Sequence, residues 1–191
     1  WHLGHHPKFL PTRQGFDHYY GIPYSNDMTI DPKNALFHED VKFREGFSIE
    51  KVRNSKTTKN FVPLMRDEKV IEYPADQSTL TKRYTEEAIN FIKDNRKKPF
   101  FLYLPHTMPH IPLFATPEFL GKSAEGLYGD TIEEIDWSVG KILEALKILD
   151  LDDNTLVVYT SDNGPWKLKS GHGGNAFPLR GYKFSTYEGG M

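Results

Sequence analysis

The 191-residue chain is 38% hydrophobic and 14% aromatic, enough for one α/β domain with a core or for a slice of a larger one. Its 24 basic residues nearly balance its 26 acidic residues, and the net charge of −2 provides no global field to attract nucleic acid. The sequence contains no apolar run of about 18 residues to span a membrane. It has no cysteine, which excludes disulfides, thiolate metal sites and a cysteine nucleophile within these residues. Any anion must therefore be bound by a local arrangement of side chains.

The first third of the sequence gives weak structural signals. Residues 1–35 are rich in Gly, Pro, His and Tyr without a sustained period, which predicts a long irregular segment. Beyond it, the runs 62–65 and 70–73 flank four polar residues, a pattern that favours a β-hairpin.

A helix and a strand are predicted next. Apolar side chains recur at helical spacing over 80–92, after Ser78 and Thr79, which can cap a helix, and before Pro99, which ends the segment. The continuous apolar run Phe100–Leu104 is then typical of a strand buried on both faces of a parallel sheet.

A second helix and a second strand follow. Asp130 and Glu133 have the spacing of a capping box, and an apolar stripe continues from there to Leu149. The β-branched run Thr155–Thr160 has the composition of a buried strand, and it ends in Ser-Asp-Asn-Gly-Pro. The predicted unit is strand, loop, helix, strand, which is the pattern of an α/β fold.

This topology gathers polar residues at one edge of the sheet. Parallel strands joined by a crossover helix end at the same edge, where ligands of open α/β sheets bind. The predicted crevice therefore collects His106, His110, Asp162 and Asn163.

The chemistry of these four residues leaves alternatives open. Asp162 and Asn163 offer adjacent hard oxygen ligands that suit Ca²⁺ or Mg²⁺, but Asp-Asn-Gly is also a common turn. His106 and His110 lie four residues apart in a proline-rich loop that excludes a helix, so they are not a one-face zinc pair. Each histidine either serves an anion at the crevice or is a half-buried residue bonded to backbone.

Three more residues have an ordinary interpretation when taken alone. His2 lies in a His-rich start without a carboxylate nearby. Lys183 lies in a Gly-flanked segment, where a lone lysine is usually a solvated cation. Ser25 is a typical turn residue. None of them alone indicates a site.

Six ordered strings resemble the sulfatase family, especially its arylsulfatase A-like branch. They are WHLG (Trp1–Gly4), QGFDHYYGIPYSND (Gln14–Asp27), FFLYLPHTMPHIP (Phe100–Pro112), GDTIEEIDWSVGKIL (Gly129–Leu143), TLVVYTSDNGP (Thr155–Pro165) and LRGYKFSTYEGG (Leu179–Gly190). The resemblance implies an alkaline-phosphatase-like α/β/α sandwich with a largely parallel central sheet, incomplete in this chain. It implies hydrolysis of sulfate monoesters by a formylglycine hydrate with a calcium ion.

The resemblance also implies roles for single residues. Asp162 and Asn163 match metal ligands, and His110 and Lys183 match residues that contact the sulfate and protonate the leaving group. His2 matches a histidine beside the formylglycine, and Ser25 matches a sulfate-contacting serine.

We expect residues 1–191 to be an internal part of the catalytic domain, with the Cys/Ser-x-Pro-x-Arg nucleophile block upstream and the C-terminal domain downstream. The piece alone is then inactive. The family implies a small-molecule or saccharide sulfate ester as substrate, a formylglycine-generating enzyme as partner, and export to a periplasm, the exterior or a lysosome. The alternatives are a phosphatase or phosphodiesterase of the same superfamily, and a non-catalytic binding module.

Overall fold

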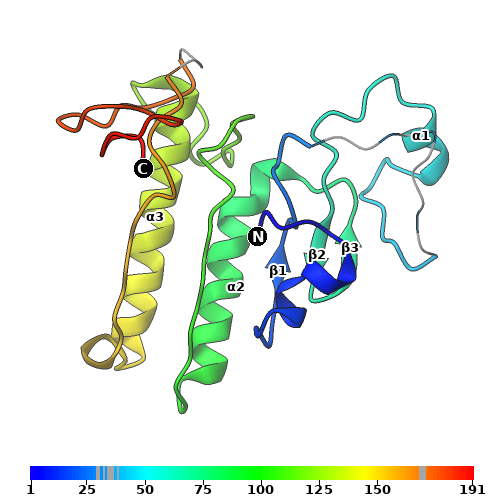
Figure 1. Cartoon of the computed structure of the whole chain (residues 1–191). Coiled ribbons are helices and arrows are strands. Elements are labelled where there is room, and N and C mark those ends of the chain that lie inside the picture. Colours follow the sequence, from blue (N-terminus) through cyan, green and yellow to red (C-terminus); the bar gives the residue numbers. More distant parts are fainter. Residues whose placement is uncertain (29–30, 32, 34–36, 38, 168–170) are drawn as a thin grey trace.

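The two longest helices lie side by side in the structure, a computed structural model that describes residues 1–28, 31, 33, 37, 39–167 and 171–191 (Figure 1). They are α2 (Leu80–Asn95) and α3 (Gly126–Ile148). In the described part, the remaining elements are short: η1 (Pro7–Phe9), η2 (Pro11–Arg13), β1 (Tyr20–Gly21), α1 (Ile49–Arg53), β2 (Leu64–Arg66), β3 (Lys69–Glu72), η3 (Gln77–Thr79) and η4 (Asp152–Asn154). Among the described residues, no helix is long and apolar enough to cross a membrane.

The predicted amphipathic helix is confirmed as α2. Its residues Leu80, Tyr84, Ala88 and Ile92 are all at most 5% exposed, which places one stripe of the helix in the core. Thr79 occupies the N-cap position of α2 but makes no side-chain cap hydrogen bond, because its hydroxyl donates to the Asp76 carbonyl at 2.8 Å. Ser78 lies in the 3₁₀ turn η3 that precedes the helix. The cap of that turn is Asp76, whose carboxylate accepts hydrogen bonds from the Ser78 backbone N–H at 3.2 Å and hydroxyl at 2.7 Å.

The helix α3 begins earlier than the sequence indicates. It starts at Gly126, so Asp130 lies inside it and does not form a capping box with Glu133. The Asp130 carboxylate instead accepts the backbone N–H groups of Gly121, Lys122 and Ser123 at 2.8–3.0 Å. These hydrogen bonds lower the pKa of Asp130 and tie the preceding loop to the helix.

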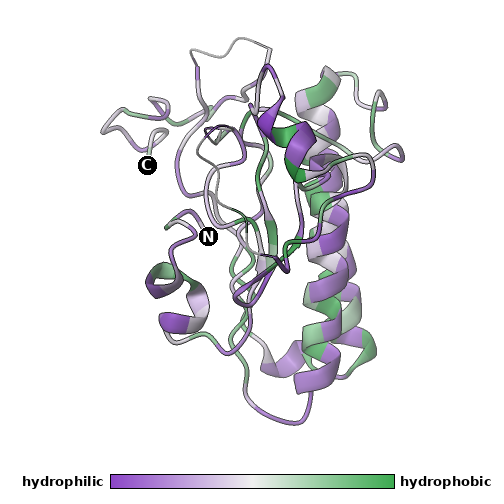
Figure 2. Ribbon diagram, turned by 90° about the vertical axis from the view of Figure 1, so that its right-hand side faces the viewer, coloured by the Kyte–Doolittle hydropathy of each residue, from purple (hydrophilic) through white to green (hydrophobic). Residues whose placement is uncertain are grey.

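The predicted hairpin is confirmed as β2 and β3, which pair antiparallel, and β1 adds to β2 to give the order β1-β2-β3. This small sheet shares a core with α2: Leu64 and Val62 are fully buried beside Leu80 and Tyr84. Figure 2 shows hydrophobic and hydrophilic residues alternating along the helices, as expected for amphipathic helices.

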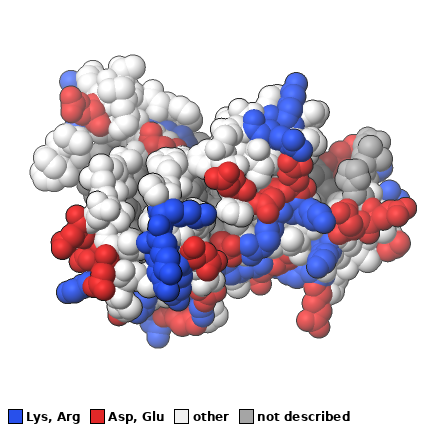
Figure 3. Space-filling view, turned by 90° about the horizontal axis from the view of Figure 1, so that it is seen from below, with Lys and Arg blue, Asp and Glu red and all other residues white. Residues whose placement is uncertain are grey.

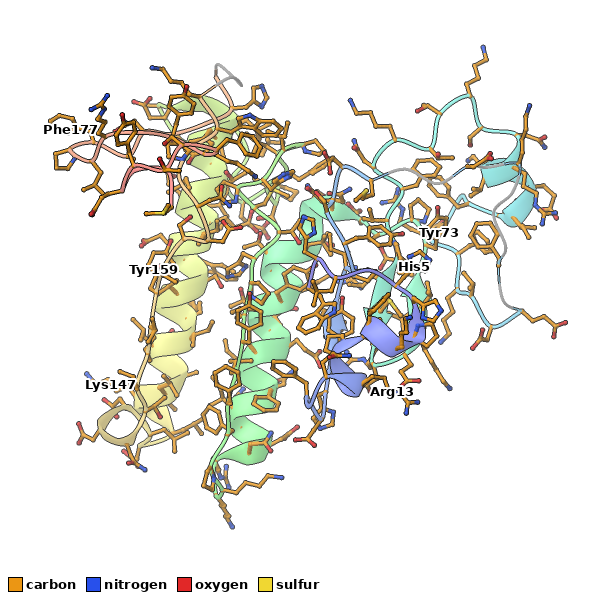
Figure 4. The ribbon with its side chains drawn as sticks, in the orientation of Figure 1. His5, Arg13, Tyr73, Lys147, Tyr159 and Phe177 are labelled. Carbon is orange, nitrogen blue, oxygen red and sulfur yellow. The ribbon has the colours of Figure 1, made fainter. Side chains whose placement is uncertain are left out.

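The prediction of two buried strands is wrong for the described structure. Phe100–Leu104 and Thr155–Thr160 are extended but belong to no strand, and Phe101, Leu156 and Val158 are 74%, 90% and 74% exposed. A strand requires a hydrogen-bonded neighbour, and within the described residues these segments have none. They do run in the same direction, one beside α2 and one beside α3 (Figure 1). Figure 4 shows Tyr159 on the second of them.

Candidate functional site

The loops 105–112 and 161–166 lie at the same end of the two helices, as the topology predicted (Figure 1). The Tyr84 hydroxyl of α2 lies 3.2 Å from the Thr107 hydroxyl and anchors the first loop. The two loops meet where the His110 and Trp166 rings approach to 6.2 Å between centroids. Two segments far apart in the sequence therefore form one surface.

His110 is half-buried in this surface and held at one ring nitrogen. Its Nδ1 lies 3.0 Å from Asn26 Oδ1 and 2.6 Å from the backbone oxygen of Ile111. Both neighbours are polar oxygens on the same side of the imidazole. The other nitrogen, Nε2, is left for other partners.

Lys183 lies on the same indole as His110. Its backbone N–H donates to the Pro165 carbonyl at 3.0 Å, and its Nζ lies 5.3 Å from the centroid of the Trp166 ring. The imidazole and the ammonium thus share one aromatic neighbour. A cation and a proton donor are the two kinds of group that stabilise charge on a leaving oxygen, and both contact Trp166 here.

Asp162 and Asn163 follow the second extended segment directly. Asp162 is exposed, while Asn163 is half-buried and its carbonyl accepts the Ser161 hydroxyl at 2.8 Å. The next residue, Gly164, donates its backbone N–H to the Gly190 carbonyl at 3.3 Å. The loop that bears these two residues is therefore hydrogen-bonded through its backbone to the C-terminal segment that also carries Lys183.

Ser25 and His2 come from the N-terminal part of the chain. The Ser25 hydroxyl donates to Asp27 Oδ1 at 2.5 Å, next to the Asn26 that contacts His110. His2 is exposed, and the backbone N–H of Gly4 donates to the Pro23 carbonyl at 2.9 Å, which places the first residues beside the same turn. Figure 4 shows the nearby His5 on this segment.

His106 has a structural role. Its Nε2 lies 3.2 Å from the Ser138 hydroxyl of α3, and burial lowers its pKa to about 4. The ring is therefore neutral near pH 7 and joins the loop to α3. A structural histidine of this kind serves packing and not an anion.

This burial makes a pH dependence predictable. The unfolded chain protonates His106 at its ordinary pKa and the folded chain does so only near 4, so stability falls as the pH drops from about 6.5 to about 4, by up to about 1.4 kcal/mol per pH unit. We expect the His106→Gln variant to lose less stability over this window. The test measures the free energy of unfolding of the wild type and the variant across this pH range. Burial raises the pKa of Glu134 in both proteins, so its contribution cancels when the two slopes are subtracted. Equal slopes would contradict the assignment.

Three residues in or beneath this surface were not predicted from the sequence: Asn26, Gln77 and Trp166. Asn26 and Gln77 are 1% and 5% exposed and bond to each other, although they lie 51 residues apart. Trp166 lies just beyond the Ser-Asp-Asn-Gly-Pro string, and that proximity was the one available signal.

Comparison with known proteins decides the family. The model of the Sulfatase family matches residues 1–191. The chain belongs to the sulfatase family. The predicted resemblance is thereby confirmed.

Several sulfatases with curated names are similar to the chain. N-acetylgalactosamine-6-sulfatase of Mus musculus is 37% identical over 100% of this chain and 34% of its own length, and arylsulfatase G of Rattus norvegicus is 33% identical over 100% and 36%. Steryl-sulfatase of Rattus norvegicus is 44% identical over 67% of this chain and 23% of its own length. The chain spans about a third of the length of the first two relatives.

A solved structure extends the comparison to the fold. The sulfatase chain resembles Ps i-CgsB in complex with k-i-k-neocarrahexaose, with a TM-score of 0.73 and 34% identity over 100% of this chain and 41% of that one. With the family match, this likeness confirms the predicted alkaline-phosphatase-like α/β fold class, of which the described residues form a mixed part with a small sheet.

Proposed function

We propose that the protein containing this chain hydrolyses sulfate monoesters. The observation that carries the proposal is the shared contact of His110 and Lys183 with the Trp166 ring, at the end of the segment that bears Asp162 and Asn163. The cation and the proton donor contact the same indole, and the two hard oxygen ligands lie on the loop that leads to it. The family membership supports the same chemistry.

Each residue has a task in this proposal. Negative charge moves onto the leaving oxygen as the S–O bond breaks, so His110 donates a proton to that oxygen and the Lys183 ammonium stabilises its charge. The Ser25 hydroxyl contacts a sulfate oxygen. His2 assists at the nucleophile, which on the family pattern is a formylglycine hydrate that attacks sulfur. The chain has no cysteine and no Ser-x-Pro-x-Arg string, so the precursor residue lies outside these 191 residues.

The oxygen donors fit part of a metal site. Asp162 and Asn163 supply a carboxylate and an amide oxygen, which suit Ca²⁺, or Mg²⁺. Ca²⁺ takes about six to eight oxygen ligands, and the described residues form no group of three or more His, Cys, Asp or Glu side chains that would complete the shell. On the family pattern, the remaining ligands come from residues outside these 191. A bound divalent cation supplies charge stabilisation to the sulfate oxygens.

We further propose a sulfated saccharide as substrate. N-acetylgalactosamine-6-sulfatase and the structure that contains neocarrahexaose both match the whole of this chain, whereas steryl-sulfatase matches two-thirds of it. Interspersed basic and acidic side chains on the face in Figure 3 form no single-signed field for nucleic acid. Export and activation by a formylglycine-generating enzyme complete the proposal.

A substrate panel tests the function. The complete reading frame that contains this chain, expressed with a formylglycine-generating enzyme, should release sulfate from p-nitrophenyl sulfate and from sulfated saccharides in the presence of Ca²⁺. Release of phosphate from p-nitrophenyl phosphate instead would support the phosphatase alternative. No hydrolysis of any ester, together with retained binding of saccharides, would support the alternative of a non-catalytic binding module.

The Asp162→Ala variant tests the metal ligand. Loss of one charged ligand should raise the Ca²⁺ concentration for half-maximal activity by about 10- to 100-fold. Asp153→Ala, on the exposed η4 turn of the same segment, is the matched control and should behave like the wild type. Titration of the chelated enzyme with Ca²⁺ measures both variants. An unchanged midpoint in Asp162→Ala would remove Asp162 from the metal site.

A further inference from the structure

We propose that Asn26 and Gln77 are positioning residues that hold the His110 imidazole in one orientation and one tautomer, with the proton on Nδ1 and with Nε2 left for the substrate. This inference rests on the proposed function of His110 as proton donor. It adds two residues that neither the sequence strings nor the family resemblance assigned.

The hydrogen position on His110 follows from its neighbours. The Ile111 oxygen, 2.6 Å from Nδ1, belongs to a backbone carbonyl and can only accept a hydrogen bond. While the ring keeps this position, Nδ1 must therefore carry a proton in both the neutral and the cationic ring. In the neutral ring, the unprotonated nitrogen is then Nε2, and protonation there creates the acid that the reaction needs.

The orientation of the Gln77 amide is fixed by two carbonyls. Its Nε2 donates to the backbone oxygens of Asn26 and Asn60, each at 3.0 Å. Because these oxygens only accept, the amide cannot rotate by 180° without losing both hydrogen bonds. Its Oε1 is therefore directed at the Asn26 side chain.

The Asn26 amide is fixed in turn. Its Nδ2 donates to Gln77 Oε1 at 3.1 Å and to the Pro112 carbonyl at 3.0 Å. With Nδ2 committed to two acceptors, Oδ1 is the atom that faces His110 Nδ1 at 3.0 Å. Backbone carbonyls at Asn60, Asn26 and Pro112 thus determine the acceptor presented to the histidine.

Burial makes this network selective. Asn26 and Gln77 are 1% and 5% exposed, so water does not replace a lost partner easily and a wrong amide orientation leaves buried polar groups unpaired. The network joins the turn at Ser25, the 3₁₀ turn η3 before α2 and the loop of His110. It therefore fixes the ring with respect to two other segments, which the Ile111 contact within the same loop does not.

The tautomer is measured directly by NMR of the full-length enzyme with ¹⁵N-labelled histidine rings. The His110 signal is the one missing from His110→Gln. With the ring neutral, we expect the coupling pattern of an imidazole protonated at Nδ1. A ring protonated at Nε2 overturns the inference, and this result needs no variant of the network.

Two variants test the network itself. In Asn26→Leu and Gln77→Leu we expect a second tautomer to appear and kcat to fall by about 10- to 100-fold with KM nearly unchanged, because the group behind a functional histidine has been lost. Gln77 does not contact His110, so its effect must pass through Asn26. An unchanged tautomer in both variants would show that the Ile111 carbonyl alone fixes the His110 ring, and it would overturn the inference.

The matched control is Thr85→Val, which removes a hydroxyl that is 1% exposed and bonded to the Thr81 carbonyl and to Ser138. It should lower the melting temperature without changing the His110 tautomer. The same spectral change in this control would show a general loss of packing and overturn the inference. The two proposals fail separately: a wild-type enzyme that is inactive on every sulfate ester contradicts the proposed function, whereas the tautomer is read without turnover.

Discussion

Replacing His110 by glutamine should lower kcat on a sulfated saccharide by about 100- to 10,000-fold, the range typical of a lost general acid. The loss should be much smaller on p-nitrophenyl sulfate. A nitrophenol leaves as an anion without a proton, whereas a sugar hydroxyl requires protonation as the S–O bond breaks. Steady-state kinetics on the two substrates, with the same enzyme preparation, measure the difference.

The control for this experiment is His18→Gln. His18 is exposed and packs edge-on against Phe91, away from the loop that carries His110. Its kinetics should match those of the wild type on both substrates. An equal loss on saccharide and aryl sulfates in His110→Gln would mean that His110 binds the sulfate without protonating the leaving group.

The second large effect is expected for Gly164→Ala. A Cβ at Gly164 would lie 1.8 Å from the carbonyl oxygen of Gly189, and that neighbour is backbone that cannot rotate away. The loop with Asn163 would have to separate from the segment with Lys183. We expect a destabilisation of about 1–3 kcal/mol from the overpacking, and a loss of most activity.

Gly140→Ala is the same substitution with the opposite expected sign. Gly140 lies exposed within α3 with nothing within 4 Å of an added Cβ. Alanine there should stabilise the helix by roughly 0.5–1 kcal/mol and leave activity unchanged. Thermal unfolding and sulfate release are measured on both variants. Full activity in Gly164→Ala would show that the two loops need not touch.

Local patterns predicted the elements that depend on local interactions. The spacing of Leu80, Tyr84 and Ile92 identified α2, and the polar turn identified the β2–β3 hairpin, because the contacts that form them lie close in the sequence. The start of α3 was missed because Asp130 bonds the loop before it, which residue spacing does not reveal. The runs from 100 and 155 have the composition of strands, but pairing depends on a distant neighbour.

The residues of the candidate site also divide into those that the sequence predicted and those that it did not. Topology placed His110 and Asp162 at one end of the fold, and the family strings added Lys183 and Ser25. Asn26 and Gln77 stayed hidden, because an amide that bonds another amide 51 residues away and a histidine 84 residues away has no periodic signature. The resemblance gave a role to His110 and none to His106, but the loop pattern alone does not show what His106 does. Burial against α3 distinguishes them, and burial is a property of the folded chain.

The two exposed extended segments bear on how the protein is made. Among the described residues, each presents exposed apolar side chains and pairs with no neighbouring strand, and α3 separates the two in the sequence. During translation, the first therefore leaves the ribosome well before the second, with its edges free to associate with other nascent chains. Slow synthesis at low temperature, with abundant chaperones, suits such a sequence better than rapid overexpression.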